Sequence, residues 1–207
     1  MNRFLLTEII CENVILTDDV MRVEMLCAHH MDNARLASET RGLRSYAGTY
    51  KGTPIAVIAC GFGKTAAMLH LKEAYELGAR RFIYLGECVS LTRHYPLMDI
   101  VVAKGYSETL TQNLKAAADL KNTVLRFEGV YTDDCFWIKG DIPGGYDIVD
   151  FAHSGFSEMA GKKSAEFVSL LVVSENSITK EKVDESVRQS GFHTASQLAF
   201  ETLHTIK

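Results

Sequence analysis

Stretches of consecutive apolar residues recur along the chain, each bounded by glycine, proline or polar residues. Runs of this kind, without strict alternation of polar and apolar positions, are typical of strands that are buried on both faces of a sheet. Two of the strands flank a tight turn at Lys51–Gly52. The predicted strand regions are 12–17, 45–60 (two strands), 80–87, 98–106, 123–137, the first part of 146–167, and 168–177.

Between these runs, apolar residues recur at helical spacing. A stripe of this kind lies within 18–37, after two acidic residues, and consists of Val20, Met21, Val23, Met25 and Leu26. Further helices are predicted at 61–79, which ends at Gly78, at 107–120, in the second part of 146–167, and over 179–207. The alternation of strands and helices predicts an α/β fold in a single domain, 1–207, with helices on both faces of the sheet.

The composition is ordinary for a globular domain, with 47% hydrophobic and 23% charged residues. The net charge is −4 (22 basic minus 26 acidic residues), and the basic residues are scattered, so we expect no nucleic-acid partner. No apolar run approaches the roughly 20 residues that span a bilayer, and we see no signal peptide. Five widely spaced cysteines without a CxxC pair favour free thiols and a cytoplasmic location.

In folds of this class, ligands bind at the carboxyl ends of the parallel strands. Five short segments fall at such ends: TDDVMR, CGFGK, GECVS, DFAHS and VVSEN. The seven histidines show no metal-ligand spacing, so we expect no metal, and no segment indicates a cofactor. The question that the five segments raise is which ligand would need an acid such as Glu87 at the end of a buried strand.

At these segments the sequence resembles the purine nucleoside phosphorylase and uridine phosphorylase family, and most closely the hexameric bacterial purine nucleoside phosphorylases. The resemblance runs from about Val14 to the C-terminus. VILTDDVMR is similar to the family's PGDPxR, RGLRSYAGTYKG to its RG…G(F/Y)TGxYKG hairpin, and GFG to its GMG turn. YLGECVS falls on RxGSCG, VDFA on (V/I)(E/D)ME, VVSEN on xxSDH, and RQSGF on RQxxF. The resemblance implies a three-layer fold with a central mixed, mostly parallel sheet flanked by helices.

The resemblance also implies a phosphate pocket. Arg22 falls on the family's phosphate-binding arginine, and guanidinium groups suit an oxyanion. Arg41 falls on an arginine that the hexameric enzymes lend across a dimer interface, so we expect a homodimer or homohexamer. Gly63, in the GFG turn, would direct backbone amides toward an anion or a sugar, although a simple strand–helix turn also accounts for it.

Glu175 falls on the family's aspartate that protonates the purine ring, and Arg188 falls on the arginine that supports this acid. A general acid is valuable there because the leaving base develops negative charge. A plain salt bridge at the last helix is the alternative for this pair. Tyr131 falls where the family stacks an aromatic ring on the base, and core packing is its alternative.

Several positions depart from the family pattern. Asp18 replaces a glycine whose amide contacts phosphate, Tyr84 replaces an arginine, and Glu87 replaces a serine. On the nucleoside side, Ala152 replaces the glutamate that holds the ribose hydroxyls, and Phe151 replaces a methionine. Asp150 matches the neighbouring acidic position, from which a carboxylate could still reach inward.

These departures change the charge of the pocket. One arginine is lost and two carboxylates are gained, and a like-charge pair at 4 Å costs roughly 4 kcal/mol at an effective dielectric near 20. We therefore expect phosphate binding to be lost. The acids would neutralise Arg22 and Arg41, activate a water molecule, or bind a cationic group.

Three functions are compatible with the family resemblance and the changed charge of the pocket. The first is cleavage of the N-glycosidic bond of a purine-type nucleoside, with hydrolysis favoured over phosphorolysis. The second is a catalytically inactive protein that binds a nucleoside, a nucleobase or another small molecule. The third is true purine nucleoside phosphorolysis, which would require either that Arg22 and Arg41 suffice to bind phosphate or that Asp18 and Glu87 point away from it.

Overall fold

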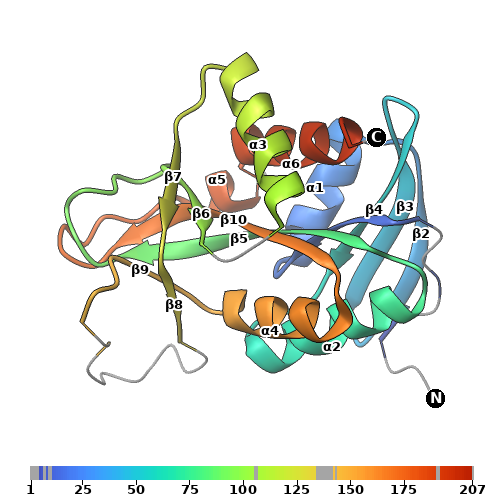
Figure 1. Ribbon diagram of the computed structural model, residues 1–207, viewed down its shortest axis with the longest axis horizontal. Helices are drawn as coiled ribbons and strands as arrows, with labels where there is room; N and C mark the ends of the chain where they lie inside the picture. Colours follow the sequence, from blue (N-terminus) through green and yellow to red (C-terminus); the bar gives the residue numbers. More distant parts are fainter. Residues whose placement is uncertain are drawn as a thin grey trace.

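The computed structural model describes residues 5–6, 8, 11–104, 107–133, 142, 144–189 and 192–206. Its centre is a sheet in the order β2-β3-β4-β1-β5-β10-β6-β7, with β9 paired to β5 and β8 to β9 (Figure 1). The strands are β1 (Asn13–Thr17), β2 (Asp32–Thr40), β3 (Leu43–Tyr50), β4 (Thr53–Ala59), β5 (Arg81–Ser90), β6 (Ile100–Ala103), β7 (Leu125–Glu128), β8 (Val130–Thr132), β9 (Ile148–Asp150) and β10 (Glu166–Asn176). The helices are α1 (Val20–His30), α2 (Lys64–Glu76), α3 (Glu108–Leu120), α4 (His153–Lys163), α5 (Glu185–Gln189) and α6 (His193–His204).

The four central strands β4, β1, β5 and β10 run parallel to one another. The hairpin strands β2 and β3 are antiparallel, and so are the pairs β3–β4, β6–β10 and β9–β5. The central strands are near-continuous apolar runs because both of their faces are covered. The predicted mixed, mostly parallel sheet is therefore confirmed.

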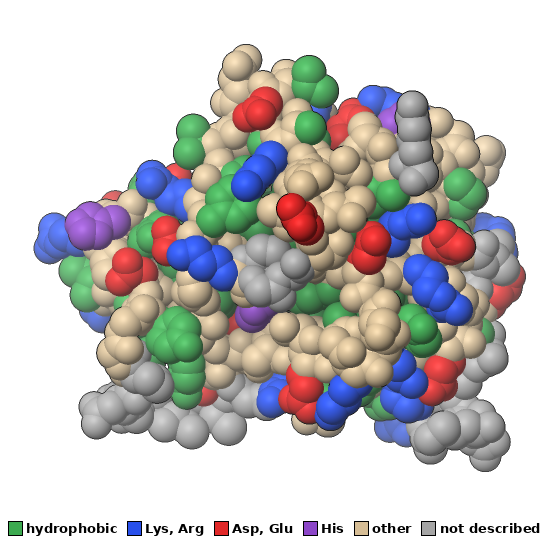
Figure 2. All heavy atoms as spheres, in the orientation of Figure 1, with side chains coloured by type: hydrophobic (Ala, Val, Ile, Leu, Met, Phe, Trp, Pro, Cys, Tyr) green, Lys and Arg blue, Asp and Glu red, His purple; other side chains and the backbone are tan. Residues whose placement is uncertain are grey.

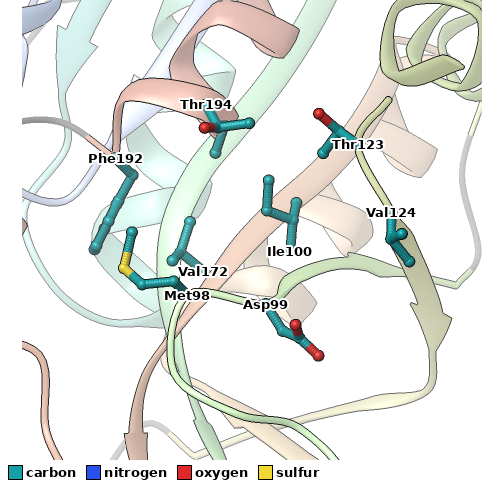
Figure 3. A pocket seen from close by; sticks show the side chains of 9 residues that line it. Met98, Asp99, Ile100, Thr123, Val124, Val172, Phe192 and Thr194 are labelled. Atoms are coloured by element: carbon teal, nitrogen blue, oxygen red, sulfur yellow. The ribbon is translucent and has the colours of Figure 1, made fainter. Parts of the chain in front are cut away.

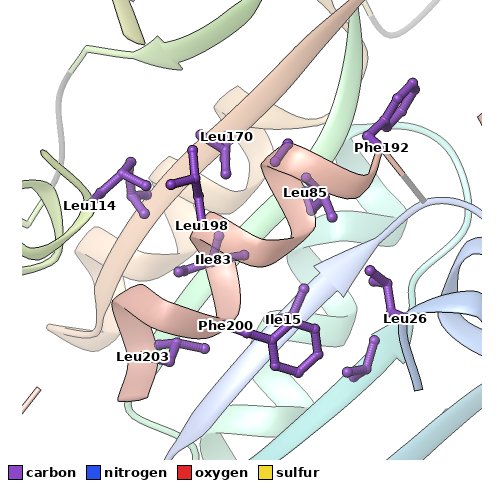
Figure 4. Packing of buried hydrophobic residues seen from close by; sticks show 14 of the residues in the cluster. Ile15, Leu26, Ile83, Leu85, Leu114, Leu170, Phe192, Leu198, Phe200 and Leu203 are labelled. Atoms are coloured by element: carbon purple, nitrogen blue, oxygen red, sulfur yellow. The ribbon is translucent and has the colours of Figure 1, made fainter. Parts of the chain in front are cut away.

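Helices cover the sheet on both sides and form the outer layers (Figure 1). Under α2 and α4, alternate strand residues such as Leu16 and Phe82 build one buried cluster. Their neighbours point the other way and build a second cluster under α1, α3 and α6. Figure 4 shows part of this second cluster, with Phe200 beside Ile15 and Leu198 beside Ile83. The three-layer prediction is thus confirmed.

Two predicted helices differ from the structure. The helix expected within 18–37 ends at His30, and residues Asp32–Thr40 form β2 instead. The C-terminal helix expected over 179–207 is divided into α5 and α6, and Phe192 precedes α6 in the left-handed conformation (φ 51°). In both places tertiary contacts override the local periodicity: β2 pairs with β3, and Phe192 is buried.

The charged side chains on the face shown in Figure 2 are of both signs. Acidic and basic side chains are interspersed over the described part of the face shown in Figure 2. Among the described helices, none is both long and apolar enough to cross a membrane. The four cysteines that the structure describes, Cys11, Cys27, Cys60 and Cys88, are free thiols, and Cys135 lies outside the described residues.

Candidate active site

The strand order brings the candidate residues to one edge of the sheet. Because β4, β1, β5 and β10 are parallel neighbours, their carboxyl ends lie side by side. Asp18 follows β1, Gly61 and Gly63 follow β4, and Glu87 and Glu175 lie in the last parts of β5 and β10. This is the edge at which ligands bind in open α/β sheets.

Arg22 is the centre of this site. It lies in the first part of α1, which Asp19 caps by accepting a hydrogen bond from the backbone N–H of Met21. The Arg22 side chain is fully buried and donates from Nη1 to Thr17 Oγ1 (2.9 Å) and Asp18 Oδ1 (2.6 Å). Its Nη2 donates to Glu87 Oε1 at 2.5 Å. The guanidinium is thus paired with two carboxylates of its own chain.

An aromatic ring also encloses the Arg22 side chain. The ring of Phe192 lies over the guanidinium, 4.8 Å from Cζ to the ring centroid, which is a cation–π distance. Arg22 Nε is buried and has no hydrogen-bond partner among the described residues. Burial raises the pKa of Asp18 above its ordinary value, and the attraction of Arg22 opposes this rise. The structure therefore places the predicted phosphate-binding arginine where its charge is already matched internally.

Glu87 joins Arg22 to a second arginine. While Glu87 Oε1 accepts from Arg22, its Oε2 lies 3.4 Å from Arg188 Nη1. Glu87 is half-buried, with 14% of its side chain exposed, whereas Asp18 is 2% exposed. Glu87 is accordingly the acid of this cluster that borders solvent.

The expected contact between Glu175 and Arg188 is not among the described ion pairs. Glu175 instead pairs with Lys182, with Oε2 2.9 Å from Nζ. The turn after β10 brings Lys182 there, because residues 181–183 form an antiparallel bridge with the end of that strand. Arg188 instead contacts Glu87, which provides a carboxylate at the position where the family has a neutral serine. Sequence reasoning missed Lys182, since only the turn geometry reveals it.

Arg41 does not reach this cluster within the described chain. It is exposed in the turn between β2 and β3, with φ 57°. The expected neutralisation of Asp18 and Glu87 therefore falls to Arg22 and Arg188. The expected role of Arg41 across a subunit interface remains a prediction.

Tyr84 fills the space behind Asp18. Its side chain is fully buried, packs on Phe156 with ring centroids 4.7 Å apart, and donates a long hydrogen bond (3.4 Å) to Asp18 Oδ2. The ring also lies over Gly86, where an added Cβ would be 2.3 Å from Tyr84 Cζ. The residue that replaces an arginine thus acts as a core side chain with one polar contact.

The nucleoside side of the site contains Asp150. Its carboxylate is buried and accepts hydrogen bonds from Thr132 Oγ1 (2.6 Å) and from the backbone N–H groups of Ala152 (3.1 Å) and His153 (2.6 Å). Burial raises the pKa of Asp150 to about 6. Asp150 therefore holds the start of α4, where its oxygens accept these hydrogen bonds, and its role toward a nucleoside remains a prediction.

Three other predicted residues line the same region. Ala152 is buried and Phe151 is partly buried, both between β9 and α4. Tyr131 lies in β8, partly buried, with its ring centroid 5.7 Å from that of Tyr146. Tyr131 thus packs against another aromatic ring and keeps part of its surface accessible. The aromatic residues Phe136 and Trp137 lie outside the described residues.

The GFG turn has the geometry that its glycines allow. Gly61 and Gly63 have φ values of 71° and 94°, and Gly63 precedes α2 without a side-chain cap. Between them Phe62 is 71% exposed. Among the described residues, no group of three or more histidine, cysteine, aspartate or glutamate side chains has metal-binding geometry.

Comparisons with known proteins found similar sequences and a similar structure. A sequence model described as "Phosphorylase superfamily" matches residues 13–141. "Purine nucleoside phosphorylase DeoD-type" of Photorhabdus laumondii is 26% identical, covering 92% of this chain and 91% of its own length. The protein of the same description from Oceanobacillus iheyensis is 23% identical, covering 94% of each chain. The crystal structure of Toxoplasma gondii purine nucleoside phosphorylase with immucillin-H has the same fold, with TM-score 0.84, 20% identity, and coverage of 94% of this chain and 90% of that chain.

Proposed function

Since this chain belongs to the phosphorylase superfamily, we propose that it cleaves the N-glycosidic bond of a purine-type nucleoside or related compound. We further propose that water, rather than phosphate, accepts the sugar. Relatives described as purine nucleoside phosphorylases, similar over more than nine-tenths of the chain, support the substrate class.

The internal pairing of Arg22 is the observation that carries the choice of water. Two guanidinium groups, Arg22 and Arg188, face two carboxylates, Asp18 and Glu87, so their formal charges sum to zero. A phosphate entering this cluster would meet both carboxylates, and each like-charge contact near 4 Å costs roughly 4 kcal/mol at an effective dielectric near 20. Water carries no such penalty.

The proposed reaction assigns a proton to each side of the broken bond. Glu175 leaves its ion pair with Lys182, takes up a proton from solvent, and donates this proton to the leaving base as the bond from the sugar carbon to the base nitrogen breaks. The water oxygen bonds to the same sugar carbon, and Asp18 or Glu87 accepts the water proton. Tyr131 and Phe151 would contact the nucleoside, while Ala152 offers no carboxylate to the ribose hydroxyls.

The test is base release from inosine, adenosine and guanosine, with and without phosphate. We expect equal rates in both conditions and a loss of about 10²–10⁴ in rate for Glu175→Gln, the range of a general acid. Glu166→Gln, at the opposite end of β10, is the matched control and should retain the rate. Release that strictly requires phosphate would show phosphorolysis and refute the choice of water.

A second function is favoured by the contact between Arg188 and Glu87. Arg188, which the resemblance implied for catalysis, is engaged there, and Asp150, which it implied for nucleoside binding, is engaged at α4. A non-catalytic protein that binds a nucleoside or nucleobase fits these contacts. This second function predicts no base release from any nucleoside. It also predicts that the melting temperature of the protein rises when a free base is added.

We also propose that the chain forms a homodimer or a homohexamer in the cytoplasm. The exposed position of Arg41 at the β2–β3 turn supports this assembly, since the side chain is accessible to a neighbouring subunit. The free thiols of Cys11, Cys27, Cys60 and Cys88 support a reducing compartment.

A further inference from the structure

A groove lies on the face of the sheet that α3 and α6 cover. It has a volume of about 260 Å³ and opens between the loop before β6, the segment before β7 and the start of α6 (Figure 3). In Figure 3, Ile100 and Val172 lie between Phe192 and Met98 on one side and Val124 on the other. The lining residues are Met98, Asp99, Ile100, Thr123, Val124, Val172, Phe192, Thr194 and Ala195.

The lining indicates the chemistry of a ligand. Among the described lining residues the one ionisable group is Asp99, which is already paired with Arg126, with Oδ2 2.7 Å from Nε, so these residues give the groove no uncompensated charge. Thr123 and Thr194 also line the groove, and their hydroxyls offer polar contacts (Figure 3). A mostly apolar cavity with a few polar groups is typical of small-molecule sites, and this volume lies just below their usual range of about 300–1,000 Å³.

The mouth of the groove is apolar as well. Met98 is 44% exposed and Val124 is 74% exposed, although both are large hydrophobic residues. Exposed apolar side chains beside a hollow mark interaction sites more often than isolated ones do. The opening is thus suited to admit an uncharged ring compound from solvent.

Phe192 connects this groove to the charged cluster at the strand ends. Its buried ring forms part of the groove wall and also lies 4.8 Å from Arg22 Cζ. Its left-handed backbone (φ 51°) is rare for a bulky residue and is held by its surroundings. A ligand that moves this ring would therefore change the environment of Arg22.

We propose that the groove is a second binding site for a small, uncharged aromatic or heteroaromatic compound, and that Phe192 transmits its occupancy to Arg22. The proposal is independent of whether the strand-end site uses water or phosphate, or turns over at all. It requires one molecule the size of a single or fused ring, with a hydrogen-bonding group for Thr123 or Thr194.

The experiment titrates indole, an uncharged fused ring with one N–H donor, into the protein and follows binding by calorimetry. Val124→Lys places an ammonium group at the mouth of the groove, and we expect at least about tenfold weaker binding because the charge must remain solvated. Leu120→Lys is the matched control. Leu120 is 86% exposed and lies four residues earlier, outside the lining.

The coupling is read from the Arg22 Nε–H signal in nitrogen-15 spectra. This buried group exchanges slowly with water, and the ring of Phe192 above the guanidinium makes its chemical shift sensitive to ring position. We expect indole to move the signal in the wild type and in Leu120→Lys, but not in Val124→Lys. Unchanged indole binding in Val124→Lys, or no binding up to the solubility limit, would overturn the site. Binding that leaves the Arg22 signal in place would overturn the role of Phe192.

Discussion

At the scale of single residues, Glu87 is the side chain on which the two arginines of the site converge. It binds Arg22 through one oxygen and approaches Arg188 through the other. Replacing it by serine, the residue that the resemblance implies, would release one face of each guanidinium. Such a change tests directly whether the carboxylate keeps anions out.

We expect Glu87→Ser to bind inorganic phosphate at least about tenfold more tightly than the wild type, because a like-charge contact is removed and two cationic groups are freed. Isothermal titration calorimetry measures the difference. Glu24→Ser is the control, since Glu24 also pairs with an arginine, Arg44, but outside the site. If Glu87→Ser gains no affinity over Glu24→Ser, the electrostatic account of the pocket fails.

Asp150 gives a second prediction, on stability against pH. Its folded pKa of about 6 lies above the ordinary value of 3.8, so the native state binds the proton more tightly than the unfolded chain does. Its contribution to stability is therefore greatest below about pH 4 and falls as the pH rises to about 6, by up to about 3 kcal/mol.

Urea denaturation of the wild type and of Asp150→Asn between these pH values measures this contribution, together with the smaller interaction between the charges of Asp150 and Asp18. The free energy of unfolding of the wild type should fall relative to that of Asp150→Asn as the pH rises. Asp119→Asn, an exposed substitution, is the control. A difference that stays constant with pH would contradict the assignment.

At the scale of elements, α6 is fixed to the sheet by Phe200. The ring is fully buried, 5.2 Å from the ring of Tyr50 and 4.9 Å from that of His30, so it joins α6 to β3 and α1. Phe200→Ala should lower the free energy of unfolding by about 3–5 kcal/mol, as expected for a large-to-small change in a core. Chemical denaturation provides the measurement, and Gln197→Ala, on a half-exposed position of the same helix, should change it by less than about 0.5 kcal/mol. Equal effects of the two substitutions would show that Phe200 does not anchor the helix.

The elements also show what sequence alone could predict. Buried runs such as 80–87 and 168–177 predicted β5 and β10, because strands covered on both faces are apolar throughout. The pattern missed β2, whose first five residues are exposed and whose order comes from pairing with β3. The positions of the site residues could be predicted from the strand ends, whereas the ion-pair partners of these residues could not. The contacts of Arg188 with Glu87 and of Glu175 with Lys182 depend on distances across the sheet and on the turn after β10.

At the scale of the whole molecule, the proposed assembly predicts its mass. Sedimentation equilibrium should give an even multiple of the 23.0 kDa chain, since a dimer or a trimer of dimers contains an even number of subunits. Arg41→Glu should weaken the association, because it places an acid at the exposed turn that would meet the neighbour. Lys104→Glu, at an exposed position away from this turn, is the charge-matched control. A mass of one chain at all protein concentrations would contradict the assembly.

The contact between Tyr84 and Gly86 restricts the order in which this site can evolve. The phenol ring occupies the volume that any side chain at position 86 would need. A larger residue at position 86 would therefore require the buried ring of Tyr84 to move away. A replacement of Gly86 should therefore be tolerated more easily in a chain that has already exchanged Tyr84 for a smaller residue, so the residue at one position limits which residues are accepted at the other.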